Sequence, residues 1–193
     1  MISGVVLAAG AATRFGSTKQ LATIGGVPLV RLAVDALRPA TDEIVVVTGH
    51  DAPAVEAALP PDVRVIRNER FRDGMATSLA AAIHGLGDDS EAAVVLLADQ
   101  PGVSAADVER VVERFRTTRA RIVRLRYADG PGPALLSREI YAESGHLHGD
   151  AGARVLMASN PDWVEEVVID RPTPPDIDTE ADLERASGRR PTT

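Results

Sequence analysis

The sequence predicts a three-layer α/β/α fold, in which helices cover both faces of a doubly wound, mainly parallel sheet. Short apolar runs alternate with amphipathic stretches through most of the 193 residues, which is the pattern of βαβ units. Three of the runs, Val5–Leu7, Ile44–Val47 and Val94–Leu97, are apolar without alternation, as expected for strands that are covered on both faces. We expect one domain over residues 1–186 and a flexible tail over residues 187–193.

Each expected element follows from its local pattern. Runs rich in Val, Ile and Leu predict strands at Gly4–Ala8, Glu43–Val47, Val63–Ile66, Ala92–Leu97, Arg121–Leu125 and Trp163–Ile169. Amphipathic stretches predict helices at Pro28–Leu37, Ala52–Leu59, Met75–Leu86, Ala105–Arg116, Arg138–Ser144, Ala151–Ala158 and Glu180–Ala186. Ser104 and Thr179 stand where N-caps of two of these helices are expected.

Composition excludes several classes of protein. The net charge of −7 and the pI of about 5.1 argue against a nucleic-acid binder or a protein of acidic membrane surfaces. The absence of cysteine excludes disulfides and thiolate metal sites, so oxygen or imidazole ligands and a hard cation such as Mg²⁺ are favoured. Without a long apolar run or a basic leader, we expect a cytoplasmic protein with no membrane span.

The loop after the first strand predicts an anion site. Residues 7–21, LAAGAATRFGSTKQL, are small around Gly10 and carry the cations Arg14 and Lys19. Small residues let backbone N–H groups approach a phosphate closely, although an ordinary strand-to-helix turn has the same composition. Lys19 is the one lysine of a chain that otherwise uses arginine. The glycine spacing matches neither a Walker A loop nor a dinucleotide fingerprint.

Further candidates follow the other strands, because ligands of parallel sheets bind beyond the carboxyl ends of the strands. Asp99 ends the fourth expected strand, shortly before Pro101. We expect it to be the first metal ligand, and the alternative is a cap of the following helix. Asn68 and Gly74–Leu79 follow the third strand, and Ser78 there faces a ligand or serves as a cap.

Taken together, these motifs resemble the molybdenum cofactor nucleotidyltransferases, the MobA-like NTP transferases. The resemblance spans Val5 to Leu183 and rests on the loop pattern LAAG-x-x-x-R-F-G-x-x-K-x-L and on four later motifs. These are Asn68 with Gly74–Leu79, Leu97–Pro101, Gly149–Arg154 and Asp176–Thr179. The motifs are most like those of the cytidylyltransferase branch, which implies a nucleotide-diphospho-sugar transferase-like fold.

The resemblance implies a Mg²⁺-dependent transfer of CMP from CTP to molybdopterin, with release of pyrophosphate. A transient contact with a molybdoenzyme is also implied, whereas no nucleic acid or membrane partner is. A GTP-dependent enzyme, a transferase to another phosphorylated acceptor such as a sugar phosphate, and a non-catalytic protein that delivers the cofactor remain alternatives.

The family's functional positions carry over residue by residue. The implied catalytic residues are Arg14, Lys19 and Asp99. The implied nucleotide-binding residues are Leu7, Ala8, Ala9, Gly10, Arg14, Lys19, Asn68, Gly74, Met75, Ser78 and Asp99. The implied metal ligands are Asp99 and Asp178, and the implied acceptor-side residues are Pro133 and Asp150.

Two features of the sequence bear on the second metal ligand and on the acceptor. Asp150 precedes an expected helix and is suited to cap it, whereas Thr179 caps the last helix and leaves Asp178 available as the second metal ligand. The family usually has P-G-H-P where this chain has Pro131-Gly132-Pro133, without the histidine. That loop lies near the acceptor in relatives, so the identity of the acceptor stays open.

Overall fold

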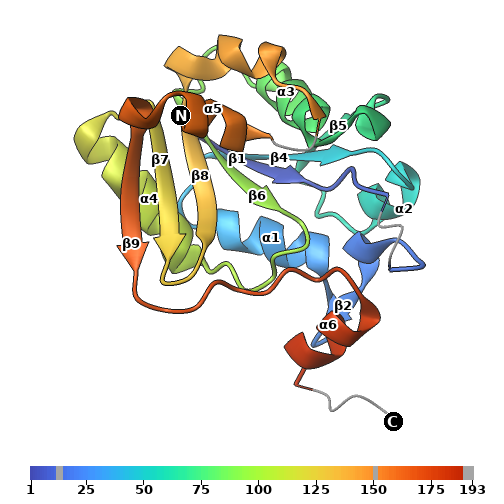
Figure 1. Cartoon of the computed structure of the whole chain (residues 1–193). Helices are drawn as coiled ribbons and strands as arrows, with labels where there is room; N and C mark the ends of the chain where they lie inside the picture. The colour runs from blue at the N-terminus through green and yellow to red at the C-terminus, as the bar shows by residue number, and fades with distance from the viewer. Residues whose placement is uncertain (12–14, 150–151, 189–193) are drawn as a thin grey trace.

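The computed structural model describes residues 1–11, 15–149 and 152–188. Its central sheet has the strand order β5-β4-β1-β6-β8-β7-β9 (Figure 1). The strands are β1 (Ile2–Leu7), β4 (Glu43–Thr48), β5 (Arg64–Arg67), β6 (Ala92–Leu97), β7 (Ile122–Tyr127), β8 (Pro131–Ser137) and β9 (Val164–Ile169). Only β8 runs antiparallel to its neighbours in this sheet, so the expected mainly parallel sheet is confirmed.

Helices pack on both faces of the sheet (Figure 1). One apolar cluster joins it to α1 (Leu29–Leu37), α2 (Ala52–Ala57) and α4 (Ala105–Thr118). A second cluster joins the other face to α3 (Met75–Gly85), the 3₁₀ helix η3 (Arg138–His146) and α5 (Ala153–Ser159). The strand β1 lies between the two clusters and is buried along its whole length, as its uninterrupted apolar pattern predicts.

The strand β8 was missed by the sequence pattern, because Pro131 and Pro133 argue against a strand inside a sheet. The structure accommodates them with an irregularity in pairing. Between Arg124 and Arg126 of β7 the register shifts by one residue, from Ala134 to Pro131 on β8. The extra residue on β8 interrupts the regular hydrogen bonds to β7 near the prolines. Bulges of this kind are among the places in a sheet that tolerate proline.

Two local details also differ from the expectation. Gly25 and Gly26 both have positive φ and connect a short hairpin of β2 (Thr23–Ile24) and β3 (Val27–Pro28), which the expected elements did not include. The expected helix at Arg138–Ser144 is a 3₁₀ helix. Ser104 and Thr179 cap their helices through complete capping boxes, as predicted.

The segment after β9 crosses the sheet edge and leads to α6 (Glu180–Ala186) (Figure 1). We call residues 170–178 the strap. Arg171 forms an ion pair with the buried Asp107, which also accepts a hydrogen bond from the Tyr127 hydroxyl at 3.1 Å. The backbone N–H of Ile177 donates to the carbonyl of Asp99 at 2.9 Å. The strap is therefore attached to α4 at one end and to the turn after β6 at the other.

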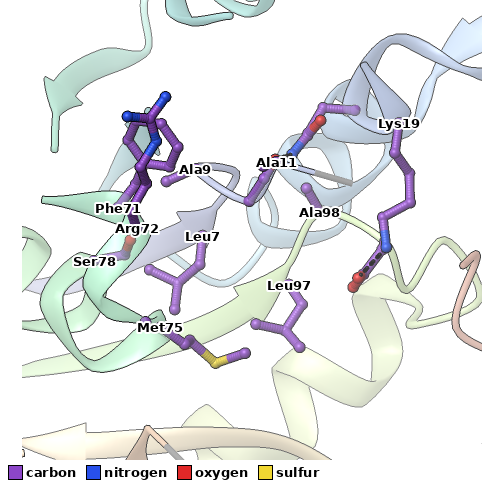
Figure 2. Close-up of a pocket in the computed structure, with 14 residues that line it drawn as sticks. Leu7, Ala9, Ala11, Lys19, Phe71, Arg72, Met75, Ser78, Leu97 and Ala98 are labelled. Carbon is purple, nitrogen blue, oxygen red and sulfur yellow. Dashed lines mark hydrogen bonds and ion pairs between the residues drawn. The ribbon is translucent and has the colours of Figure 1, made fainter. Parts of the chain in front are cut away.

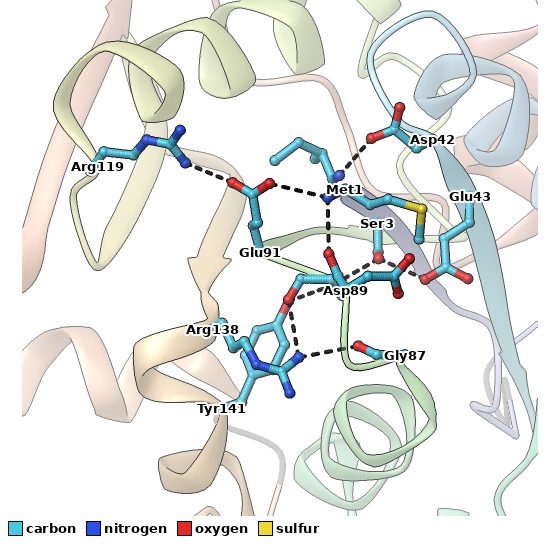
Figure 3. Close-up of polar contacts among 12 residues, drawn as sticks. Met1, Ser3, Asp42, Glu43, Gly87, Asp89, Glu91, Arg119, Arg138 and Tyr141 are labelled. Carbon is cyan, nitrogen blue, oxygen red and sulfur yellow. Dashed lines mark hydrogen bonds and ion pairs between the residues drawn. The ribbon is translucent and has the colours of Figure 1, made fainter.

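The amino end of β1 is closed by polar contacts (Figure 3). The Met1 ammonium donates to the Glu91 carboxylate at 3.2 Å. The buried Ser3 hydroxyl lies 2.8 Å from both the Glu43 carboxylate and the Ser90 hydroxyl. These contacts tie β1 to β4 and to the start of β6, so this edge of the sheet is held by the protein's own groups.

The described part of the chain ends just after α6. Ser187 and Gly188 close α6 with backbone hydrogen bonds to Leu183 and Arg185, and residues 189–193 of the expected tail lie outside the described residues. Within the described ranges, no helix combines the length and the apolar character that crossing a bilayer requires.

The strap contact makes a prediction about stability. Arg171→Gln removes the cation beside Asp107, whose side chain is only 4% exposed, and a buried charge that loses a partner is costly. We expect the free energy of unfolding in urea to fall by about 1–3 kcal/mol. Arg126→Gln is the control, because its exposed pair with Glu166 is worth less than about 1 kcal/mol. Equal losses in both variants would contradict the role of the strap contact.

Candidate active site

A pocket of about 510 Å³ opens beyond the carboxyl ends of β1 and β6 (Figure 2). Of the residues that the sequence indicated, it is lined by Leu7, Ala9, Gly10, Lys19, Gly74, Met75, Ser78 and Asp99. The two strands are parallel neighbours, and the N–H of Ala98 donates to the carbonyl of Leu7 at 3.2 Å. This adjacency brings the loop after β1 beside Asp99, where ligands of parallel sheets bind.

Lys19 lies between two carboxylates at one side of the pocket, and Figure 2 shows its contact with one of them. Its ammonium nitrogen Nζ is 2.8 Å from Asp99 Oδ2 and 3.0 Å from Asp178 Oδ1. The lysine begins the short 3₁₀ helix η1 (Lys19–Leu21) and its side chain is 11% exposed. Asp99 lies in the turn after β6 and Asp178 at the end of the strap, so these ion pairs join three segments that are distant in the sequence.

The charges of this cluster affect one another. Burial lowers the pKa of Lys19, but hydrogen bonds and negative charge from Asp99 and then Asp178 outweigh it, so the pKa is raised and the ammonium stays charged. Loss of hydration raises the pKa of Asp176, the Gln100 hydrogen bond opposes this, and the charges of Asp99 and Asp178 add to the rise. The three aspartates thus leave an excess of negative charge around one lysine.

Two buried oxygens at the pocket are available as acceptors. Asp99 Oδ1 has no hydrogen-bond partner in the part of the chain that the structure describes. Gln20 Oε1 is also without one there, while Gln20 Nε2 donates to the carbonyl of Gly10 at 2.8 Å. Buried polar atoms are normally paired, so these two oxygens are unsatisfied acceptors beside the pocket.

The far side of the pocket is formed by the segment after β5. Phe71 and Arg72 line it, with the Arg72 guanidinium 5.4 Å from the centre of the Phe71 ring (Figure 2). Neither residue belongs to the motifs that the sequence analysis singled out. Ala11, Gln20, Leu97 and Ala98 complete the lining; they lie within the loop and the Leu97–Pro101 motif that the sequence indicated, but were not themselves named as site residues.

Gly74 requires its glycine. Its φ of +105° is a conformation that other residues rarely adopt, and a Cβ there would lie 2.5 Å from the carbonyl carbon of Gly149. Gly152 in turn lies against Met75, since its own Cβ would be 3.3 Å from the Met75 sulfur. The segment around Gly149 therefore packs directly on the wall of the pocket.

Other expected site residues lie elsewhere. Ala8 is 1% exposed and packs in the cluster beneath α1, so it does not line the pocket. Asn68 is buried behind the wall, where its amide donates to the Ser78 hydroxyl at 2.9 Å. Pro133 is buried in β8, the strand beside β6, and does not line the pocket either. Arg14 and Asp150 lie outside the described residues.

Comparison with known proteins decides the family. The MobA-like NTP transferase domain matches residues 4–165, which include every residue that lines the pocket, whereas Asp178 of the strap lies beyond the match. The chain belongs to the MobA-like NTP transferase family. For a nucleotidyltransferase of this family, the pocket with Lys19 and Asp99 lies where the fold binds ligands.

Similar proteins carry different names. Nicotine blue oxidoreductase of Paenarthrobacter nicotinovorans is 33% identical, and the match covers 92% of each chain. The bifunctional protein GlmU of Rubrobacter xylanophilus is 34% identical over 77% of this chain, which spans only 30% of the length of that relative. The crystal structure of Rv0371c from Mycobacterium tuberculosis is 34% identical with a TM-score of 0.87, covering 97% of both chains, and another structure of that protein contains manganese.

The close approach at Gly74 makes a prediction about this MobA-like site. Gly74→Ala strains the backbone and pushes against Gly149, which we expect to cost about 1–3 kcal/mol of stability. It also displaces Met75 and Ser78, so nucleoside triphosphate affinity should fall with it. Gly145→Ala is the control, because its φ is not positive and no atom lies within 4 Å of the added Cβ. Thermal melting and nucleotide titration measure both effects, and an unchanged Gly74→Ala protein would contradict them.

Proposed function

We propose that this member of the family is a Mg²⁺-dependent nucleotidyltransferase that transfers CMP from CTP to molybdopterin. The observation that carries the proposal is the meeting of Lys19, Asp99 and Asp178 beside the loop of Ala9 and Gly10. A lysine and two carboxylates around a pocket at this edge suit a triphosphate and a divalent cation, and the family is one of NTP transferases.

The reaction needs little acid–base chemistry. A phosphate oxygen of the acceptor attacks the α-phosphorus of CTP, a new P–O bond forms, and the bond to the bridging oxygen of the β-phosphate breaks, so pyrophosphate leaves. The attacking oxygen is already ionised, and catalysis rests on positioning and charge stabilisation. In this scheme Lys19, together with Arg14 of the same loop, holds the phosphates and stabilises charge on the leaving pyrophosphate.

The residues present fit a magnesium ion. Asp99 Oδ1 is buried and unpartnered among the described residues, and the Asp178 side chain is 51% exposed, which leaves its second oxygen accessible. Carboxylate oxygens are the ligands that Mg²⁺ prefers. When bound by Asp99 and Asp178, the ion supplies neutralising charge to the phosphates. The manganese in a structure of the similar Rv0371c supports a divalent cation here.

The proposal also names a base, cytosine, and an acceptor, molybdopterin. The apolar side of the pocket, with Leu7, Phe71 and Leu97, is suited to a planar base, and the resemblance to the cytidylyltransferase branch favours cytosine over guanine. The acceptor would approach from the side of Asp150 and Pro133, because the neighbouring Gly149 packs on the pocket wall. Because the family histidine is missing, a sugar phosphate is the alternative acceptor.

A second candidate comes from the match to Nicotine blue oxidoreductase, which covers 92% of both chains. This chain would then be an oxidoreductase that acts on nicotine blue or a similar compound. It has no dinucleotide fingerprint of the G-x-G-x-x-G kind after β1, and the lysine with two carboxylates is suited to phosphates instead. We therefore favour the transferase.

A nucleotide panel tests the proposal. CTP, GTP, UTP and ATP are each incubated with Mg²⁺, with and without reduced molybdopterin or a sugar 1-phosphate, and pyrophosphate release is measured. We expect release with CTP and molybdopterin together. Faster release with GTP would assign the guanylyl branch, and tight nucleotide binding without release would favour a delivery protein. A change in the absorbance of added nicotine blue, without pyrophosphate release, would favour the oxidoreductase.

The metal assignment makes a separate prediction. Asp178→Asn removes one proposed ligand charge from an exposed position, so the Mg²⁺ concentration for half-maximal activity should rise about 5-fold or more with little change in melting temperature. Asp35→Asn is the matched control, because its carboxylate forms only exposed pairs with Arg31 and Arg38. If the two variants need the same Mg²⁺ concentration, Asp178 is not a ligand.

A further inference from the structure

Lys19 is the group that Asp99 and Asp178 bind in this structure. One oxygen of each carboxylate accepts a hydrogen bond from its ammonium, at 2.8 and 3.0 Å. The lysine is 9% exposed, so little water screens it from these partners. Its backbone is fixed in η1, and the neighbouring Thr18 hydroxyl donates to Asp51 at 2.5 Å. The ammonium is thus held in place between the two carboxylates.

A divalent cation bound by the same carboxylates would lie close to this ammonium. Magnesium–oxygen distances are about 2.1 Å, so an ion on either oxygen of these carboxylates would be within about 7 Å of Nζ. Two like charges at that distance in a partly buried site repel strongly. The ion therefore binds well only when Lys19 is drawn towards another anion.

The triphosphate supplies that anion. An ammonium has three N–H donors, of which the two carboxylates use two, so the third is available to a phosphate oxygen. As phosphate oxygens take over Lys19, Asp99 and Asp178 are released from it. Asp99 Oδ1, which has no partner among the described residues, can then face a cation with its full charge.

We propose that Lys19 is a resident counter-ion that keeps divalent metal off Asp99 and Asp178 until a nucleoside triphosphate binds. This inference rests on the proposed function and adds to it an order of binding, in which the nucleotide enters before or together with the metal. The nucleotide-free protein thereby keeps its carboxylates paired and does not retain free metal.

Calorimetric titration with Mn²⁺ alone, without nucleotide, tests the inference. Lys19→Met keeps a side chain of similar length and removes the charge. We expect it to bind Mn²⁺ about 10-fold or more tightly than the wild type. Adding Asp99→Asn to Lys19→Met should return the affinity to the wild-type level or below. Unchanged or weaker binding by Lys19→Met would overturn the inference.

Arg38→Gln is the matched control. It removes the same amount of charge, and Arg38 likewise holds two carboxylates, those of Asp62 at 2.6 Å and Asp35 at 3.5 Å. These are exposed and distant from the pocket, so Mn²⁺ affinity should stay at the wild-type level. An equal gain in Arg38→Gln would assign the effect to net charge and overturn the inference.

The wild-type protein gives a second measurement that needs no variant. Because Lys19 is the one lysine in the sequence, protein labelled with ¹⁵N-lysine gives one side-chain ammonium resonance to follow. We expect Mg²⁺ alone to leave it unmoved, and CTP with Mg²⁺ to shift it. A shift with Mg²⁺ alone at the same concentration would overturn the inference. Neither metal titration measures turnover. A negative result in the nucleotide panel, which tests the proposed function, is therefore distinguishable from a negative result in the titrations, which test the order of binding.

Discussion

The site depends on one interaction, the ammonium of Lys19 held between Asp99 and Asp178. The two carboxylates lie 80 and 159 residues from the lysine in the sequence. They meet because β1 and β6 are parallel neighbours and because the strap is attached to Asp99 by the Ile177 backbone. The strap itself is held by the Arg171–Asp107 contact. The geometry of a pocket at the sheet edge is thus determined by contacts at two other places in the fold.

The features that the sequence predicted are those with a local cause. Uninterrupted apolar runs predict strands covered on both faces, and β1 and β4 are such strands. Capping depends on a residue and its neighbour three positions later, and Ser104 and Thr179 both form the expected boxes. Ala9 and Gly10 after β1 and Asp99 after β6 lie at one edge, because parallel strands present their carboxyl ends together.

The features that it missed depend on contacts distant in the sequence. The strand β8 is stabilised by pairing on both sides, which overrides the prolines at its start. Phe71 and Arg72 enter the pocket because the segment after β5 turns towards β1, and no motif marks them. Ala8 fails to line the pocket because the strand alternation continues past Leu7, so its side chain faces the opposite side from those of Leu7 and Ala9.

The charge at the site explains why lysine stands at position 19 in a chain that otherwise uses arginine. Asp99 and Asp178 bind one ammonium and Asp176 lies nearby, so the carboxylates outnumber the cation. Burial raises the pKa of Asp176, and the charges of Asp99 and Asp178 add to the rise. A planar guanidinium presents its donors in a fixed fork, which suits one carboxylate held bidentately. An ammonium directs three donors in different directions from one small atom and can bond two separate carboxylates and a phosphate oxygen in turn. That exchange of partners requires a compact cation on a flexible stem, and lysine provides it.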